Sequence, residues 1–259
     1  MGARAGRADG ERPNAARMYD YFLGGKDNYA VDRELARKLL KKRPEVAVVA
    51  RENRRFLGRA VRYLAAECGV RQFIDIGTGI PARGNTHEVA RSAAPDSRVV
   101  YVDNDPVVLA YARALLARDA STVAVRADLR EPETILDAPA VRGLIDFTEP
   151  VALLFVAVLH FIQDEDGPYD LVARYRDAVP AGSYLVVSHA EDNPNNAAAK
   201  ATYSKSTSQA AWRDRPAIER FFTGWDVLDP GVVYVHEWRP TGDEEPSDLG
   251  LCGVGHKTG

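Results

Sequence analysis

Residues 72–79 read QFIDIGTG, a short run of β-forming residues that ends in two closely spaced glycines. A mostly apolar run of this length fits a strand buried on both faces, as the strands of parallel sheets are. Gly77 and Gly79 let the backbone turn tightly and approach a ligand closely, because no Cβ intervenes. The stretch therefore predicts the first strand of a parallel sheet, followed by a ligand-binding turn.

Short β-rich runs and helical patterns alternate from this stretch to about residue 188. The helical pattern after the glycines begins with a capping box of Asn85 and Glu88, and the next begins at Asp105-Pro106. Such alternation predicts a doubly wound α/β fold, in which helices cover both faces of a mostly parallel sheet. Four further strands are expected at residues 99–102, 123–127, 151–156 and 184–188.

The sequence pattern near the C-terminus predicts two more strands. Residues 225–228 and 232–237 are β-rich and flank the turn Asp229-Pro230-Gly231. A turn of this composition between two such runs is typical of an antiparallel hairpin. We therefore expect a seven-stranded sheet that ends in a hairpin.

The first seventy residues show helical patterns and no strand pattern. Asn14 can cap a helix that ends at Gly24-Gly25, Asp32 can cap a second, and a third spans about residues 44–68. The charged run RENRR at 51–55 is interpreted as a solvated face of this third helix. The expected parts of the chain are a disordered leader (1–12), a helical cap or lid (13–70) and an α/β core that binds the cofactor (71–259).

Composition and charge argue against several classes of protein. The formal net charge is −3 and no long block of one sign occurs, which disfavours nucleic-acid binding through a broad basic face. No apolar run reaches the roughly 18 residues that span a bilayer, and the N-terminus lacks an apolar signal segment. Cys68 and Cys252 are far apart and lack metal-ligand spacing, so we expect no disulfide framework, no metal site and a cytoplasmic location. The sequence leaves the oligomeric state open.

Polar residues follow the first three expected strands, at the edge where a doubly wound sheet binds its ligands. Asp75 precedes the glycine turn, Asp103 follows the second strand and Asp128 follows the third. A carboxylate about twenty residues beyond a glycine turn can accept both hydroxyls of a ribose, and Asp128 can accept a hydrogen bond from an adenine amino group. We therefore predict a nucleoside site. Its residues are Asp75, Gly77, Thr78, Gly79, Asp103, Asn104, Asp128 and Leu129.

The glycine turn also indicates which nucleoside fits. Residues 77–82, GTGIPA, formally match the dinucleotide fingerprint, but Pro81 would interrupt the helical turn that should hold a pyrophosphate. Asp75 would repel a diphosphate, whereas it suits a cationic ligand. S-adenosylmethionine carries an ammonium and a sulfonium and no phosphate, so electrostatics favours this cofactor over NAD.

The runs 75–79, 101–103 and 127–129 resemble the successive motifs of class I methyltransferases, which have a Rossmann-like fold. Further distinctive stretches are DYFLGGKDNY at 20–29, IGTGIP at 76–81, GNTHEVA at 84–90, PG at 230–231 and EWRP at 237–240. With these stretches the chain is similar, from Asn14 to Lys257, to an actinobacterial family of S-adenosylmethionine-dependent methyltransferases, formerly a domain of unknown function. The resemblance implies the class I strand order with a reversed last strand, and cofactor binding at the three strand ends.

Methyl transfer needs a base only if the acceptor holds a proton at neutral pH. His160, after the fourth strand, and His189 with Glu191, after the fifth, are the candidates for that role, and packed or capping histidines are the alternative. The aromatic and polar segment 19–29 is a candidate lid over the cofactor or acceptor, and a helix hairpin packed on the sheet edge is the alternative. The predicted lid residues are Tyr19, Tyr21, Lys26, Asn28 and Tyr29.

These features favour a methyltransferase that uses S-adenosylmethionine and acts on a small-molecule acceptor. Two other functions stay open at this point. One is a non-catalytic S-adenosylmethionine-binding protein that kept the pocket. The other is an NAD-dependent oxidoreductase, which Pro81 disfavours.

Overall fold

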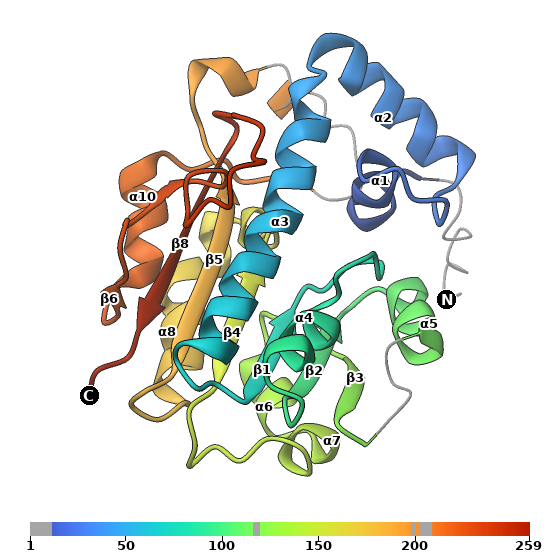
Figure 1. Cartoon of the computed structure of the whole chain (residues 1–259). Helices are drawn as coiled ribbons and strands as arrows, with labels where there is room; N and C mark the ends of the chain where they lie inside the picture. Colours follow the sequence, from blue (N-terminus) through green and yellow to red (C-terminus); the bar gives the residue numbers. More distant parts are fainter. Residues whose placement is uncertain (1–11, 116–119, 198–199, 202–208) are drawn as a thin grey trace.

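The computed structural model of the chain describes residues 12–115, 120–197, 200–201 and 209–259. Almost all of the expected leader, residues 1–12, lies outside these ranges. A central sheet runs through the molecule with helices on both faces, and the N-terminal helices lie beyond its upper end in the view of Figure 1. This is the mixed α/β architecture that the sequence predicts.

Within the described ranges, the sheet contains eight strands. They are β1 (Gln72–Ile76), β2 (Arg98–Asp103), β3 (Thr122–Arg126), β4 (Ala152–Val156), β5 (Tyr184–Ala190), β6 (Asp226–Val227), β7 (Val233–Tyr234) and β8 (Gly250–His256). Five parallel strands lie in the order β3-β2-β1-β4-β5, and β8 continues the sheet antiparallel to β5. The expected mostly parallel sheet with one reversed strand is therefore confirmed.

Helices cover the two faces of this sheet separately. They are α1 (Ala15–Phe22), α2 (Ala30–Lys42), α3 (Glu45–Ala66), α4 (Thr86–Ala93), α5 (Pro106–Leu115), α6 (Pro132–Leu136), α7 (Pro139–Arg142), α8 (Pro168–Asp177) and α10 (Arg215–Glu219). Phe73 of β1 belongs to a core with residues of α3 and α4, whereas its neighbour Ile74 belongs to a core with residues of α6 and α8. Within the described ranges, no helix is both long and apolar enough to cross a membrane.

The C-terminal edge differs from the expected hairpin. β6 and β7 do not pair with each other; both pair antiparallel with β8 and occupy successive stretches of the same edge. The turn at 229–231 therefore interrupts one edge strand and does not reverse the chain. The hairpin prediction was wrong because it did not include β8, and this additional strand raises the expected seven strands to eight within the described residues.

Glycine explains why β8 was overlooked. The strand reads GLCGVGH, and glycine is depleted in strands, so the pattern does not indicate β-structure. Packing requires the glycines: a Cβ on Gly253 would lie 2.9 Å from Cζ of Phe222, and one on Gly255 would lie 2.7 Å from Cβ of Trp225. β8 thus has no side chains at the positions where those two rings cover it.

The N-terminal helices form a hairpin around a buried ion pair. Nε of Arg17 in α1 donates to Oδ2 of Asp32 in α2 at 2.7 Å, and both side chains are almost fully buried. Asp32 also accepts from the backbone N–H groups of Asn14 and Tyr29, at 2.8 Å each. Asp32 is therefore the third residue of α2 and caps it from inside, while Tyr29, and not Asp32 as expected, is the N-cap residue.

Replacing Gly255 by valine should lower the free energy of unfolding by about 1–3 kcal/mol, because the added carbons overlap Cβ of Trp225 and crowd the ring of Phe222 in a closely packed core. Urea denaturation followed by circular dichroism measures this change. Gly58→Ala in α3 is the matched control: its Cβ meets no atom within 4 Å, so the better helix propensity of alanine should stabilise the protein by up to about 1 kcal/mol. Equal stabilities of Gly255→Val and the native protein would contradict the packing described for β8.

Candidate functional site

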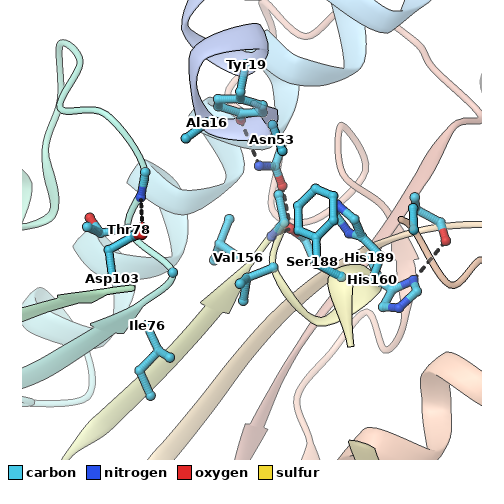
Figure 2. A pocket seen from close by; sticks show the side chains of 18 of the residues that line it. Ala16, Tyr19, Asn53, Ile76, Thr78, Asp103, Val156, His160, Ser188 and His189 are labelled. Carbon is cyan, nitrogen blue, oxygen red and sulfur yellow. Dashed lines mark hydrogen bonds between the residues drawn. The ribbon is translucent and has the colours of Figure 1, made fainter. Parts of the chain in front are cut away.

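A cavity of about 640 Å³ lies where the parallel strands end. Its floor comes from the turns after β1, β2, β3, β4 and β5, and its roof comes from α1 and the first half of α3. Figure 2 shows side chains from these elements, among them Tyr19, Asp103 and His160, around one space. The strand ends therefore meet at a single edge of the sheet, as the sequence predicts.

The cavity brings together most of the residues that the sequence singles out. Those that line it are Tyr19, Asp75, Gly77, Thr78, Gly79, Asp103, Asn104, Asp128, Leu129 and His160. The other four predicted lid residues are not part of the lining. Tyr21 receives a hydrogen bond from Arg37, Lys26 is exposed, Asn28 is buried against Asp20, and Tyr29 is 42% exposed.

The glycine turn needs both of its glycines, for different reasons. Gly77 has a φ of +73°, and a Cβ there would lie 2.2 Å from Cγ2 of Val158. Gly79 has a φ of +65°, but a Cβ there would meet no atom of the described residues within 4 Å. Gly77 thus permits close packing, whereas Gly79 leaves its backbone open to the cavity, where a ligand can approach it.

Asp103 fixes this turn from the end of β2. Its Oδ2 accepts from the backbone N–H of Gly79 at 3.0 Å, and its Oδ1 accepts from that of Asp105 at 2.9 Å. Burial raises the pKa of Asp103, and these two hydrogen bonds oppose that rise. Each carboxylate oxygen can accept a second hydrogen bond, so the group can hold the turn and still bind ligand hydroxyls.

Asp75 is the most deeply buried carboxylate of the cavity wall, with 5% of its surface exposed. Its Oδ2 accepts from Oγ1 of Thr86, the first residue of α4, at 2.6 Å. Loss of hydration raises the pKa of Asp75 to about 6, although Thr86 and the charge of Arg54 oppose that rise. The site therefore holds a carboxylate whose negative charge is poorly compensated by the protein.

Asp128 lies in a more exposed setting. It is engaged by Arg130, whose Nε and Nη2 donate to its two oxygens at 3.0 and 2.7 Å. The Arg130 guanidinium lowers the pKa of Asp128 and keeps the group ionised. Nδ2 of Asn104 lies 3.5 Å from the same carboxylate, so the ends of β2 and β3 are linked at the cavity edge.

Arg54 is a lining residue that the sequence interpretation missed. The run 51–55 was interpreted as a solvated helix face, but Arg54 of α3 lines the cavity beside the glycine turn. Its Nη2 donates to Oδ1 of Asn85 at 3.0 Å. Among the described residues it forms no ion pair with a carboxylate, so its positive charge is available to a ligand. Sequence periodicity gives no signal for this, because the cavity is formed by tertiary packing.

A row of hydrogen bonds connects the roof of the cavity to its floor. Nδ2 of Asn53 in α3 donates to the hydroxyl oxygen of Tyr19 in α1 at 2.9 Å, and the Tyr19 hydroxyl donates to the carbonyl of Ala50 at 3.0 Å. Ser188 of β5 donates through Oγ to Oδ1 of Asn53, and accepts from the backbone N–H of Ala157 at 2.9 Å (Figure 2). Ala157 has a φ of +56°, an uncommon conformation that this hydrogen bond helps to maintain.

Two histidines lie at the same end of the cavity, with ring centroids 5.5 Å apart. Nδ1 of His189 lies 2.8 Å from the carbonyl of Ala190, and its Nε2 lies 3.0 Å from Nη1 of Arg213. A carbonyl only accepts and a guanidinium only donates, so His189 is neutral with its proton on Nδ1. Burial lowers its pKa well below the usual range, with a further contribution from His160.

His160 is neutral too, since burial and then the charge of Arg213 lower its pKa to about 4. Its Nδ1 is buried and has no hydrogen-bond partner among the residues that the structure describes. Across the described part of the chain, no cluster of three or more histidine, cysteine, aspartate or glutamate side chains is arranged to hold a metal ion.

Comparison with known proteins places this geometry in a family. The sequence profile of a family described as S-adenosyl methyltransferase matches residues 1–258. No curated protein matches the chain significantly. A solved structure of a candidate methyltransferase from Thermobifida fusca is 43% identical, with a TM-score of 0.91 and 97% of each chain covered.

A protein of the DUF574 family from Streptomyces avermitilis is 40% identical, with a TM-score of 0.92, and the match covers 97% of this chain and 100% of that one. An O-methyltransferase family protein from Burkholderia thailandensis is 15% identical, with a TM-score of 0.56 over 96% of this chain and 65% of its own, and shares the fold alone. The resemblance seen in the sequence is thus confirmed over nearly the whole chain. The chain belongs to the S-adenosyl methyltransferase family and is a methyltransferase whose cofactor is S-adenosylmethionine.

Proposed function

We propose that this enzyme binds S-adenosylmethionine at the ends of β1, β2 and β3 and transfers its methyl group to a small molecule bound under α1 and α3. The observation that supports this arrangement best is the distribution of charge around the cavity. Acidic side chains and one available arginine line the part near the glycine turn, in positions that suit the charges of the cofactor.

The cofactor's polar groups each have a partner in this proposal. The buried carboxylate of Asp75 binds the ammonium group, since that cation compensates a charge that the protein leaves poorly compensated. Asp103 accepts from the ribose hydroxyls, and Asp128 with Leu129 lies against the adenine. The backbone of Thr78 and Gly79, which no Cβ shields at Gly79, lies against the methionine part.

Arg54 completes this set. The methionine part of the cofactor carries a carboxylate as well as an ammonium, and burying that carboxylate without a cation would be costly. Of the two arginines that line the cavity, Arg130 is already bound to Asp128, whereas Arg54 has no carboxylate partner among the described residues. We therefore assign Arg54 to the carboxylate of the methionine part.

The acceptor is proposed to be a small molecule. A cavity of about 640 Å³ is in the range of small-molecule sites, and the cofactor takes part of that volume. The net charge of −3 does not favour nucleic-acid substrates. Both cysteines are free thiols in the structure, which fits the reducing conditions of a cytoplasmic location.

Residues 13–70 are proposed to act as a cap that closes the cavity over its ligands. Nδ2 of Asn14 donates to Oδ2 of Asp105 at 2.9 Å, which joins the start of α1 to the loop after β2. Tyr19 forms part of the roof from the same helix. A roof attached at this edge would exclude water from the reacting groups. Tyr21, Lys26, Asn28 and Tyr29 do not line the cavity, so their role as lid residues stays a prediction.

The proposed chemistry asks little of the protein beyond alignment and one proton acceptor. S-adenosylmethionine supplies a methyl group already activated by positive sulfur. The cavity walls orient the acceptor toward that group and exclude water. His160 is neutral near pH 7, so its unpartnered Nδ1 can accept a hydrogen bond or a proton from the acceptor.

Replacing Asp75 by asparagine should weaken binding of S-adenosylhomocysteine at pH 7.5 by tenfold or more, because the ammonium loses its counter-charge. Calorimetric titration measures this, and NAD should not bind either protein. The same change should stabilise the ligand-free fold by up to about 3 kcal/mol. Burial raises the pKa of Asp75 to about 6. Each pKa unit above the value in the unfolded chain corresponds to roughly 1.4 kcal/mol by which the ionised carboxylate destabilises the folded state.

The stability gain has a definite pH dependence. Asp75 is protonated in both folded and unfolded chains below about pH 4 and ionised in both above about pH 6, so the gain should be full above pH 6 and vanish toward pH 4. Asp128→Asn is the control with the opposite sign, because Arg130 lowers the pKa of Asp128 and its loss should not stabilise the fold. Native-like binding of S-adenosylhomocysteine by Asp75→Asn would refute the proposed placement of the ammonium.

Replacing Arg54 by glutamine should weaken S-adenosylhomocysteine binding by about 10–100-fold, the usual range for losing a charge-assisted hydrogen bond of about 1.5–3 kcal/mol. Binding of 5′-methylthioadenosine, which lacks the amino-acid part, should not change. Arg62→Gln, on an exposed position of the same helix, should bind both ligands normally. Equal losses for both ligands in Arg54→Gln would show that the arginine supports the fold and does not bind the carboxylate.

A further inference from the structure

The charged side chains of the cavity gather at one end. The charged lining residues are Arg54, Asp75, Asp103, Asp105, Asp128, Arg130 and Asp166. They lie at the ends of β1, β2 and β3 or beside them, and Asp166 is 3.8 Å from Arg130. The opposite end is formed by α1, the start of α3, residues 157–163 after β4, the end of β5 and residues 209–212. Among the described residues that line this second end, which we call the neutral end, none is an aspartate, glutamate, lysine or arginine.

The two histidines do not add charge to the neutral end. The hydrogen bonds of His189 fix its neutral form, and burial keeps His160 neutral. Arg213, whose guanidinium contacts Nε2 of His189, is 4% exposed and does not line the cavity. Its guanidinium donates to the carbonyls of Leu159 and Ile162 and to the carboxylate of Asp164, so its charge is compensated away from the cavity.

Most polar groups of the neutral end are already satisfied within the protein. The Tyr19 hydroxyl donates to Ala50 and accepts from Asn53, while the Ser188 hydroxyl donates to Asn53 and accepts from Ala157. Nδ1 of His160 differs from them, because it is buried and finds no partner in the described part of the chain. Apolar side chains surround these groups, among them Phe22, Val49, Phe161, Trp212 and Leu249.

We infer that the acceptor is an uncharged, largely apolar molecule whose hydroxyl group faces His160. The inference rests on the proposed function, since it assumes that the cofactor occupies the charged end. An ionised carboxylate or ammonium placed in the neutral end would lose its hydration and find no opposite charge in return. An apolar skeleton has no charge to desolvate there, and one hydroxyl group can donate a hydrogen bond to Nδ1 of His160.

The transfer step balances with these groups. The acceptor oxygen forms a bond to the methyl carbon as the carbon–sulfur bond breaks, and that bonding pair goes to sulfur, which leaves S-adenosylhomocysteine. The hydroxyl proton passes to Nδ1 of His160 and from there to solvent. His160 is therefore a catalytic residue in this proposal, whereas Asn53 and Ser188 are positioning residues that hold the wall of the neutral end.

The test uses the full-length protein saturated with S-adenosylhomocysteine and three probes of one skeleton: naphthol, naphthoate and naphthylmethylammonium. Titration calorimetry should show naphthol binding at least tenfold more tightly than either charged probe. Equal or tighter binding of naphthoate or the ammonium, or no detectable binding of naphthol, would overturn the inference. Failure of S-adenosylhomocysteine itself to bind would instead overturn the proposed function.

A variant separates the hydroxyl contact from general affinity. His160→Ala should weaken naphthol binding at least fivefold while binding of S-adenosylhomocysteine stays normal. His256→Ala, which removes a histidine at the far end of β8, should leave naphthol binding unchanged. Unchanged naphthol binding in His160→Ala would contradict the placement of the hydroxyl.

Discussion

The buried carboxylate of Asp75 is the constraint on which the site depends. Asp75 lies in β1, where it is buried and has little hydration. The hydrogen bond from the Thr86 hydroxyl and the charge of Arg54 only partly compensate its negative charge. A protein selected for stability alone would place a neutral residue there. A cation bound beside Asp75 would compensate its charge. The surrounding features suit such a ligand: two glycines open the turn, Asp103 supplies a second carboxylate, and Arg54 can bind a negative group.

The second constraint is the attachment of the N-terminal helices to the sheet. The ion pair of Arg17 and Asp32 makes α1 and α2 one unit, and the hydrogen bonds of Tyr19, Asn53 and Ser188 join that unit and α3 to β5. These side chains use their hydrogen-bonding capacity on each other, so they form a wall that is polar in composition but offers little to a ligand. The cavity thus acquires a charged end and a neutral end from two separate sets of contacts.

Sequence patterns predicted the features that depend on neighbouring residues. The strands from β1 to β5, the capping box of Asn85 and Glu88, and the acidic residues at the strand ends follow from short-range periodicity and turn chemistry. β8 was not predicted because its glycines do not indicate a strand. They are required by the side chains of Phe222 and Trp225, which come from another part of the chain. The position of Arg54 was not predicted because an arginine on a helix is usually solvated. The hydrogen bond of Asn53 with Ser188 was not predicted because the two residues are 135 positions apart in the sequence. Those features depend on tertiary packing, which a single sequence does not display.

A crystal structure of the protein with S-adenosylhomocysteine tests most directly whether the charges of the cavity match those of the cofactor. We expect the amino group within hydrogen-bond distance of Asp75, the carboxylate against Arg54, the ribose hydroxyls on Asp103 and the sulfur facing the neutral end. A ligand whose amino-acid part points away from Asp75 and Arg54, or whose adenosine lies outside the ends of β1, β2 and β3, would contradict this arrangement.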